Sequence, residues 1–242
     1  MKITSAALIA LLLSSTLTSQ VMAMSDDEII ASFRAEQNST GNIADAIEAV
    51  TGQRGWMNSD MKSLFDAKIV GKAATALMRP ALTKDKTKYP PYHLQILDEA
   101  EPGSVLIYVM EDGTDIAAIG NLMATTAQVR GLEGVVIDGA VRDVTAIRKM
   151  KFPVFARRIS PATSVGRMIP VGKQIPVKCG GIDVNPGDIV VGDPDGVVVV
   201  PRWAAEKVLS LLADYDERES KMMPIILEEK SLLRAIERYN RY

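Results

Sequence analysis

Two neighbouring stretches of sequence decide the fold: Gly120-Asn121-Leu122-Met123-Ala124-Thr125 and Gly131-Leu132-Glu133-Gly134-Val135-Val136-Ile137-Asp138-Gly139-Ala140-Val141-Arg142-Asp143. The apolar run Gly134–Ile137 lies between glycines and predicts a buried strand that ends at Gly139. Helical patterns predict a helix on each side of it, Leu122–Arg130 and Val144–Met150. Because strands that alternate with helices pair in parallel, these stretches predict an α/β domain.

Short apolar runs cut by Gly, Pro and Asp continue on both sides of this centre. They predict further strands at Lys68–Met78, Ser104–Val109, Ile116–Ile119, Val154–Ala156, Gln174–Val177 and Val197–Val200. Turn residues at Gly187-Asp188 and at Asp193-Pro194-Asp195-Gly196 predict hairpins between consecutive strands. Parallel and antiparallel pairs together indicate a layered α/β domain with a mixed sheet.

Helical patterns flank this α/β core and divide one domain, residues 24–242, into three parts. Residues 24–66 are predicted to be helical from a capped start at Ser25-Asp26-Asp27-Glu28 to about Phe65, with an interruption at Gly52 and Gly55. Residues 67–201 form the core, and residues 202–242 form a charged helical tail whose pattern Pro224 breaks. Such a tail usually packs on its own domain or on a neighbouring subunit.

The first 23 residues have the layout of a secretory signal peptide. Lys2 precedes an apolar run from Ala6 to Leu13, and Val21-Met22-Ala23 offers small residues for a signal peptidase. The run is too short to span a bilayer, which takes about 20 residues. The sequence therefore predicts a periplasmic or secreted protein without stable membrane insertion. The alternative is that Met24 is the true start and the protein is cytoplasmic.

Composition narrows the classes of partner and metal. Lys and Arg number 28 against 30 Asp and Glu, with no basic stripe, which argues against a nucleic-acid partner. Cys179 is the only cysteine and His93 the only histidine, so an internal disulfide and a cysteine zinc site are excluded. Any metal must be held mostly by oxygen atoms, which favours Mg²⁺ or Mn²⁺.

The candidate site combines a helix start with an Arg-Asp pair. A helix that opens after Gly120-Asn121 leaves the N–H groups of Leu122 and Met123 free for an anion such as a carboxylate. Arg142 and Asp143 follow a strand, at the edge where open α/β sheets bind ligands. Asp143 can hold a divalent cation and Arg142 can neutralise an oxyanion, which suits a 2-oxo acid. The structural alternative is an exposed pair in which Asp143 caps the next helix.

At this point the sequence resembles the class II 4-hydroxy-4-methyl-2-oxoglutarate aldolases, a family that also contains the RraA-type regulators of ribonuclease activity. The resemblance spans roughly residues 43–219. Beyond the two stretches already quoted, it rests on these motifs: Glu101-Pro102-Gly103-Ser104-Val105-Leu106, Phe152-Pro153-Val154-Phe155-Ala156, Ser160-Pro161-Ala162, Cys179-Gly180-Gly181, Asn185-Pro186-Gly187-Asp188, Gly192-Asp193-Pro194-Asp195-Gly196-Val197 and Pro201-Arg202.

The resemblance implies a layered β/β/α RraA-like domain, assembled as homotrimers or homohexamers with active sites between subunits. It implies a lyase that depends on Mg²⁺ or Mn²⁺, releases pyruvate, and often decarboxylates oxaloacetate. Asp143 would bind the metal, Arg142 would contact the keto or enolate oxygen, and the amides of Leu122 and Met123 would take the substrate carboxylate beside Gly120.

This chain departs from the family pattern at Asn121, where family aldolases often carry an acidic residue that orders a water of the metal shell. Asn can hydrogen-bond that water but cannot accept its proton. A second carboxylate from the C-terminal helix of a neighbouring subunit would fall near Asp216, Glu217 or Glu219, of which Glu219 is preferred. Two alternatives stay open: a non-catalytic RraA-type regulator, and a diverged member that acts on another 2-oxo or hydroxy acid.

Other chemically capable residues carry weaker signals. For His93 a structural role is favoured over a catalytic one, and Ser160 and Ser164 lack a nearby histidine. Lys173 and Lys178 could form a Schiff base, but nothing marks either as having a depressed pKa. The thiol of Cys179 is predicted to be packed rather than reactive.

Overall fold

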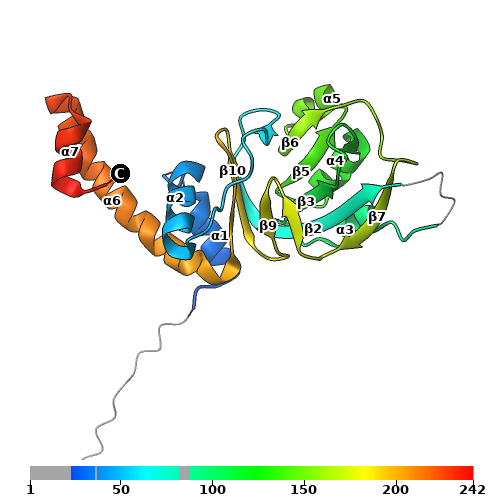
Figure 1. The fold of residues 1–242 in the computed structure, drawn as a ribbon, viewed down its shortest axis with the longest axis horizontal. Helices are drawn as coiled ribbons and strands as arrows, with labels where there is room; N and C mark the ends of the chain where they lie inside the picture. The colour runs from blue at the N-terminus through cyan, green and yellow to red at the C-terminus, as the bar shows by residue number, and fades with distance from the viewer. Residues whose placement is uncertain (1–22, 36, 82–87, 242) are drawn as a thin grey trace, which may run out of the picture.

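The computed structural model describes residues 23–35, 37–81 and 88–241. A mixed sheet lies at the centre of the domain (Figure 1). It has nine strands, in the order β1-β6-β5-β3-β2-β10-β11 with β4 beside β5 and β7 beside β2. β8 and β9 form a separate two-stranded sheet. The strands are β1 (Lys62–Ser63), β2 (Ile69–Pro80), β3 (Val105–Met110), β4 (Ala117–Ile119), β5 (Gly134–Val141), β6 (Val154–Ile159), β7 (Met168–Lys173), β8 (Val177–Cys179), β9 (Ile182–Val184), β10 (Ile189–Asp193) and β11 (Gly196–Val200).

The central strands β2, β3, β5 and β6 run parallel, because helices connect most of them. β7, β10 and β11 add antiparallel pairs, so the expected mixed α/β sheet is confirmed. The helices are α1 (Asp26–Arg34), α2 (Thr40–Thr51), α3 (Tyr92–Glu99), α4 (Asn121–Val129), α5 (Val144–Met150), η1 (Arg202–Ala204), α6 (Ala205–Glu229) and α7 (Leu232–Tyr239).

Apolar side chains on the two faces of the sheet form separate cores. One face packs against α3, α4 and α5, with Leu106, Ile137 and Phe152 buried between the layers. The other face packs against β8 and β9 through Val136 and Phe155. A third core joins α1, α2 and the start of α6 to β10 and β11. This layering leaves the starts of α4 and α5 at one edge of the sheet.

The chain begins its described structure as the sequence predicts, with a capped helix. The Ser25 hydroxyl accepts a hydrogen bond from the backbone N–H of Glu28, whose carboxylate accepts from the N–H of Ser25. Two N–H groups that the first helical turn cannot pair are thereby satisfied. Apart from Ala23, the expected leader lies outside the described residues.

Several predicted boundaries are wrong. The predicted interruption at Gly52 is confirmed, because Gly52 adopts a left-handed conformation and closes α2 after Thr51, but no helix follows it toward Phe65. Of the predicted strand Gln174–Val177, only Val177 lies in a strand, as the first residue of β8, whereas residues 174–176 connect β7 to β8 and Gln174 has a φ of 50°. The turn at Gly187-Asp188 makes no hairpin, since β9 pairs with β8 and β10 pairs with β2 and β11. The turn after Asp193 does join a hairpin, β10–β11.

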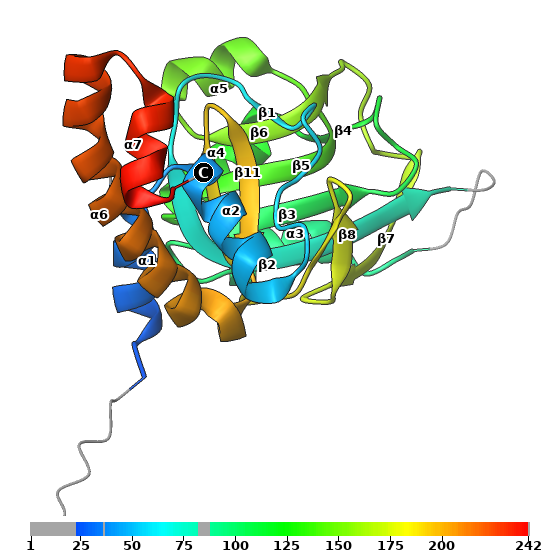
Figure 2. The ribbon, with the colours of Figure 1, turned by 60° about the vertical axis from the view of Figure 1, so that its left-hand side comes forward.

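The C-terminal tail is a long helix followed by a short one that folds back on it (Figures 1 and 2). The expected break at Pro224 is wrong, because α6 runs through it to Glu229. Met222 and Ile225, on either side of the proline, are buried against Ala235 of α7, so packing holds the helix where one backbone hydrogen bond is missing. Among the described residues, no helix is both long and apolar enough to cross a bilayer.

We expect the Cys179 thiol to be unreactive in the folded protein. Its side chain is fully buried, and burial together with the charge of Asp138 raises the pKa of the thiol well above its usual value. Reaction with a thiol reagent at pH 8 should therefore be at least about 100-fold slower than in the chain unfolded in guanidinium, because the thiolate forms only after local opening. Equal labelling rates would contradict the packed position.

Candidate functional site

Two connections bring the predicted site residues together at one edge of the sheet. β4 ends one residue before Gly120, and β5 ends one residue before Arg142. Because β4 and β5 are paired in parallel, their carboxyl ends lie side by side. The Asp143 carboxylate accepts a hydrogen bond from the backbone N–H of Asn121, with a distance of 2.9 Å between Oδ2 and N. The Arg142 Nε lies 3.9 Å from the same Oδ2.

Asp143 does not cap the helix that follows it. It occupies the N-cap position of α5, but its side chain makes no capping hydrogen bond there. Its backbone has a φ of 58°, a left-handed conformation that is uncommon outside glycine, asparagine and aspartate. This conformation accompanies a carboxylate that is turned to the start of α4 instead. The structural alternative of an ordinary helix cap is therefore wrong.

Gly120 leaves the space that the two charged side chains occupy. A Cβ built at this position would lie 2.6 Å from the Asp143 Oδ2 and 2.9 Å from the Arg142 Nε. The backbone of Gly120 is extended, with a φ of −127°, so its conformation alone does not demand glycine. The requirement at residue 120 is for space beside Arg142 and Asp143.

An open hollow of about 500 Å³ lies in front of these groups. Asp143, Asn121 and Leu122 line one part of it, and the first residues of α5, Val144 to Ala146, line the rest. The Leu122 side chain is 83% exposed. Within the described part of the chain, the N–H groups of Leu122 and Met123 have no acceptor, as expected for the first turn of a helix. The hollow thus presents the N–H of Leu122 and the carboxylate of Asp143, and the Arg142 guanidinium lies next to that carboxylate.

The donor set suits a hydrated Mg²⁺ or Mn²⁺ ion better than an ion enclosed by protein. Asp143 is half exposed, and only its Oδ2 is hydrogen-bonded, which leaves Oδ1 available. Among the described residues, no three acidic, histidine or cysteine side chains gather closely enough to hold a metal. Mg²⁺ commonly uses one or two carboxylates and takes its other ligands from water and substrate. Asp143 therefore fits a Mg²⁺ or Mn²⁺ ion that takes one ligand from the protein and the others from water and substrate.

Glu219 lies apart from this hollow within its own chain. Its carboxylate accepts hydrogen bonds from Asn42 of α2 and from Arg241 after α7, each at 3.2 Å. His93 is a half-buried residue of α3 whose backbone carbonyl accepts from the Tyr108 hydroxyl, and burial lowers the pKa of its imidazole. The contribution of Glu219 to a neighbouring subunit's site stays a prediction, as do the catalytic roles of Asn121, Arg142 and Asp143.

Sequence reasoning missed a polar cluster just before the site. Asp138 of β5, Arg157 of β6 and Asp60 form two ion pairs, with Arg157 between the carboxylates. One signal was present, since Asp138 interrupts the apolar run of a strand that is otherwise buried. Its partners are remote in sequence, and no local pattern identifies them.

The chain is similar to known proteins in sequence and in fold. A family model described as RraA-like, Aldolase/RraA, matches residues 40–199. The chain belongs to this family. The family predicted from the sequence motifs is therefore confirmed, and with it a fold in which mixed sheets are layered with helices.

Relatives of this Aldolase/RraA protein differ in their assigned roles. A Halalkalibacterium halodurans protein named "Putative 4-hydroxy-4-methyl-2-oxoglutarate aldolase" is 29% identical over 221 residues, which cover 88% of this chain and 97% of the relative. Streptomyces coelicolor RraAS2, described as an unusual member of the RNase ES inhibitor RraA family, is 26% identical with a TM-score of 0.71, covering 82% of this chain and 97% of that one. An uncharacterized Pseudomonas syringae protein shares the fold, with a TM-score of 0.75, 24% identity, and 86% and 96% of the two chains covered.

Proposed function

We propose that this protein is a carbon–carbon lyase that cleaves a 4-hydroxy-2-oxo acid such as 4-hydroxy-4-methyl-2-oxoglutarate, or decarboxylates oxaloacetate, and releases pyruvate. One observation carries the proposal: the Asp143 carboxylate lines a hollow together with the start of α4, and it accepts the Asn121 N–H while the Arg142 guanidinium lies beside it. The family membership and the aldolase name of the Halalkalibacterium relative support the same class of reaction.

The donors of the hollow suit the charges of a 2-oxo acid. The free N–H groups of Leu122 and Met123, at the positive end of the α4 dipole, would bind the substrate carboxylate. Arg142 would then face the keto oxygen. Negative charge develops on this oxygen when the bond between C3 and C4 of the substrate breaks and leaves an enolate. A divalent cation held by Asp143 would supply a second positive charge next to that oxygen.

Proton transfer needs a group other than Asp143, whose carboxylate would be held by the cation. The Asn121 amide can orient a water molecule but cannot accept its proton. We assign this task to a carboxylate of a neighbouring copy, with Glu219 as the candidate, in a homotrimer or homohexamer whose active sites lie between subunits. The pairing of Glu219 with Arg241 and Asn42 shows which contacts it would have to exchange.

The direct test is pyruvate release. Purified protein with Mg²⁺ or Mn²⁺ should release pyruvate from 4-hydroxy-4-methyl-2-oxoglutarate or from oxaloacetate, in parallel with an established aldolase of this family. A panel of other 2-oxo and hydroxy acids extends the test to the alternative of a diverged enzyme, which Asn121 favours. An absence of pyruvate from every substrate, with the reference aldolase active, would overturn the proposal.

The similarity to RraAS2 supports a second function, that of a protein-binding regulator. The two functions differ in their need for Asp143, since a regulator that binds only protein has no use for a cation there. Calorimetric titration with Mn²⁺ of the wild type and of Asp143→Ala separates them. Heat in the wild type alone supports the enzyme, whereas equal heats in both favour the regulator.

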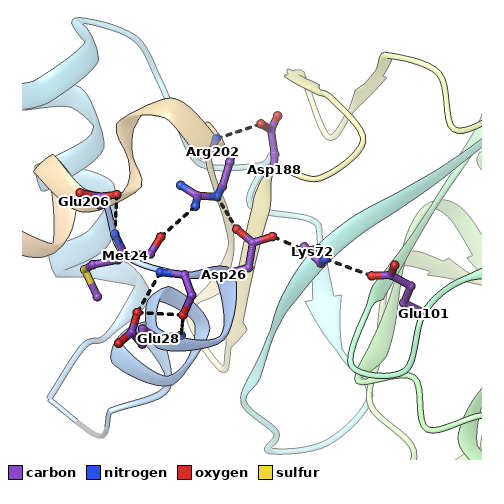
Figure 3. A network of polar contacts seen from close by, with 9 residues as sticks. Met24, Asp26, Glu28, Lys72, Glu101, Asp188, Arg202 and Glu206 are labelled. Atoms are coloured by element: carbon purple, nitrogen blue, oxygen red, sulfur yellow. Dashed lines mark hydrogen bonds and ion pairs between the residues drawn. The ribbon is translucent and has the colours of Figure 1, made fainter. Parts of the chain in front are cut away.

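Export with removal of residues 1–23 is a further proposal. Its support is the way Met24 is held: its N–H lies 3.1 Å from Glu206 Oε1, and its carbonyl accepts from Arg202 Nη2 at 3.3 Å (Figure 3). Cleavage after Ala23 would turn that N–H into an ammonium group facing the same carboxylate. The same network includes Asp26, which pairs with Arg202.

We expect the full-length chain, expressed in a Gram-negative bacterium, to accumulate in the periplasm with Met24 as its first residue. Intact-mass measurement and N-terminal sequencing check this result. Ala23→Leu should retain the leader, because signal peptidases require a small residue before the cut. Wild-type protein that stays in the cytoplasm and begins at Met1 would show that residues 1–23 are no leader.

A further inference from the structure

β5 contains a bulge immediately before the candidate site. Its register against β6 shifts between Ile137, which pairs with Ala156, and Ala140, which pairs with Arg158. Two residues, Asp138 and Gly139, therefore stand opposite one residue of β6, Arg157. A bulge bends its strand and changes the direction of the residues that follow it. In this strand, those residues lead directly to Arg142 and Asp143.

An ion pair spans the bulge. Arg157 Nη1 lies 2.9 Å from Asp138 Oδ1, and the other oxygen of Asp138 accepts the N–H of Gly180 at 2.7 Å. Both side chains are mostly buried, with 24% of Arg157 and 16% of Asp138 exposed. The hydrogen bond that Arg157 donates to Asp138 raises the pKa of the guanidinium, which therefore stays charged. Buried pairs often cost as much in desolvation as they gain, so stability alone does not account for it.

The opposite side of β5 changes neighbours at the same point. β3 pairs with β5 as far as Asp138, and β4 takes over from Ala140. A Cβ on Gly139 would lie 2.6 Å from the Met110 Cγ, so the strand passes close to the end of β3 there. The sequence prediction that the strand ends at Gly139 is wrong for this reason. β5 continues to Val141, and the N–H of Arg142 donates to the Ile119 carbonyl at 3.0 Å.

We propose that Asp138 and Arg157 are positioning residues: their ion pair fixes the bulge that directs Arg142 and Asp143 to the start of α4. The consequence for catalysis rests on the proposed function. The geometric consequence does not, because the hydrogen bond from the Asn121 N–H to Asp143 reports where that carboxylate lies.

The test compares a double variant that removes the Asp138–Arg157 ion pair with a single variant that removes only the Asp60–Arg157 ion pair. Asp138→Asn combined with Arg157→Met removes the pair across the bulge while leaving an acceptor for the Gly180 N–H. Asp60→Asn removes the second carboxylate of Arg157, 2.8 Å away, and leaves the bulge pair in place. Hydrogen exchange of the Asn121 amide, Mn²⁺ affinity, kcat and KM for pyruvate release, and Tm are measured for both.

In the double variant we expect at least tenfold faster exchange at Asn121 and a loss of about 10- to 100-fold in Mn²⁺ affinity and kcat, the usual effect of removing a partner that orients a ligand. KM should change less than kcat, and Asp60→Asn should stay near the wild type in all these properties. If the double variant fails to fold, Arg157→Lys replaces it and should give an intermediate exchange rate, because lysine keeps the charge but not the two-sided contact.

Two outcomes would overturn the inference: unchanged exchange and Mn²⁺ affinity in a folded double or lysine variant, or equal losses in Asp60→Asn. Its failure is distinguishable from that of the proposed function. A wild type that releases no pyruvate while the Asn121 amide responds to the double variant loses the function and keeps the positioning role. An active wild type whose Asn121 amide does not respond loses the positioning role alone.

Discussion

Replacing Asp143 with asparagine is expected to remove divalent-cation binding and pyruvate release while the fold stays intact. Asparagine is nearly the same size and tolerates the left-handed backbone at this position, where φ is 58°. Its amide oxygen can still accept the hydrogen bond from the Asn121 N–H, which the Asp143 Oδ2 accepts at 2.9 Å. Only the negative charge is lost. We expect kcat/KM to fall about 10³-fold, since a Lewis acid contributes several kcal/mol to such a reaction.

The matched control is Asp115→Asn, which makes the same charge change at an exposed residue outside the hollow. It should leave Mn²⁺ affinity and kcat/KM within about twofold of the wild type. Calorimetry measures the affinity, and circular dichroism with thermal unfolding checks the fold. An Asp143→Asn protein that binds Mn²⁺ as tightly as the wild type would exclude this carboxylate as the metal ligand.

Local signals were enough to predict the parts of the site. The Gly120-Asn121 helix start and the Arg142-Asp143 pair each follow a short apolar strand, and parallel pairing brings such strand ends together. The same reasoning predicted the Ser25 capping box, because its two hydrogen bonds join residues three apart. Where the deciding contact is local, the sequence was a sufficient guide.

Contacts between remote residues explain most of what was missed. A glycine after an apolar run is typical of a strand end, but at Gly139 the glycine allows the close approach of Met110 from another strand. A proline is typical of a helix end, but the helix continues through Pro224 because Met222 and Ile225, on either side of it in the chain, pack against α7. The direction of the Asp143 carboxylate depends on an N–H that is 22 residues away in the chain. None of these partners can be identified from the neighbouring sequence.

Gly120→Ala tests the requirement for space beside the charged pair. The added methyl group would lie 2.6 Å from the Asp143 Oδ2 and 2.9 Å from the Arg142 Nε, so both groups must move. Both belong to side chains that are about half exposed, no backbone atom is among the nearest contacts, and the backbone of residue 120 is extended, so the variant should fold with a Tm within a few degrees of the wild type. A catalytic group displaced by about 1 Å can lose 10²-fold in rate, and we expect kcat/KM to fall by about that factor.

The control for this variant is Gly41→Ala in α2, where a Cβ would meet nothing closer than the Ser39 hydroxyl oxygen at 3.7 Å. Its activity should equal that of the wild type, and its stability should rise slightly because alanine favours a helix. The Asn121 amide adds an independent readout, since its hydrogen exchange should accelerate in Gly120→Ala as the Asp143 carboxylate leaves it. Full activity in Gly120→Ala would mean that Arg142 and Asp143 act from positions other than those at the start of α4. An inactive variant with slow exchange at Asn121 would instead place the steric effect on Arg142 alone.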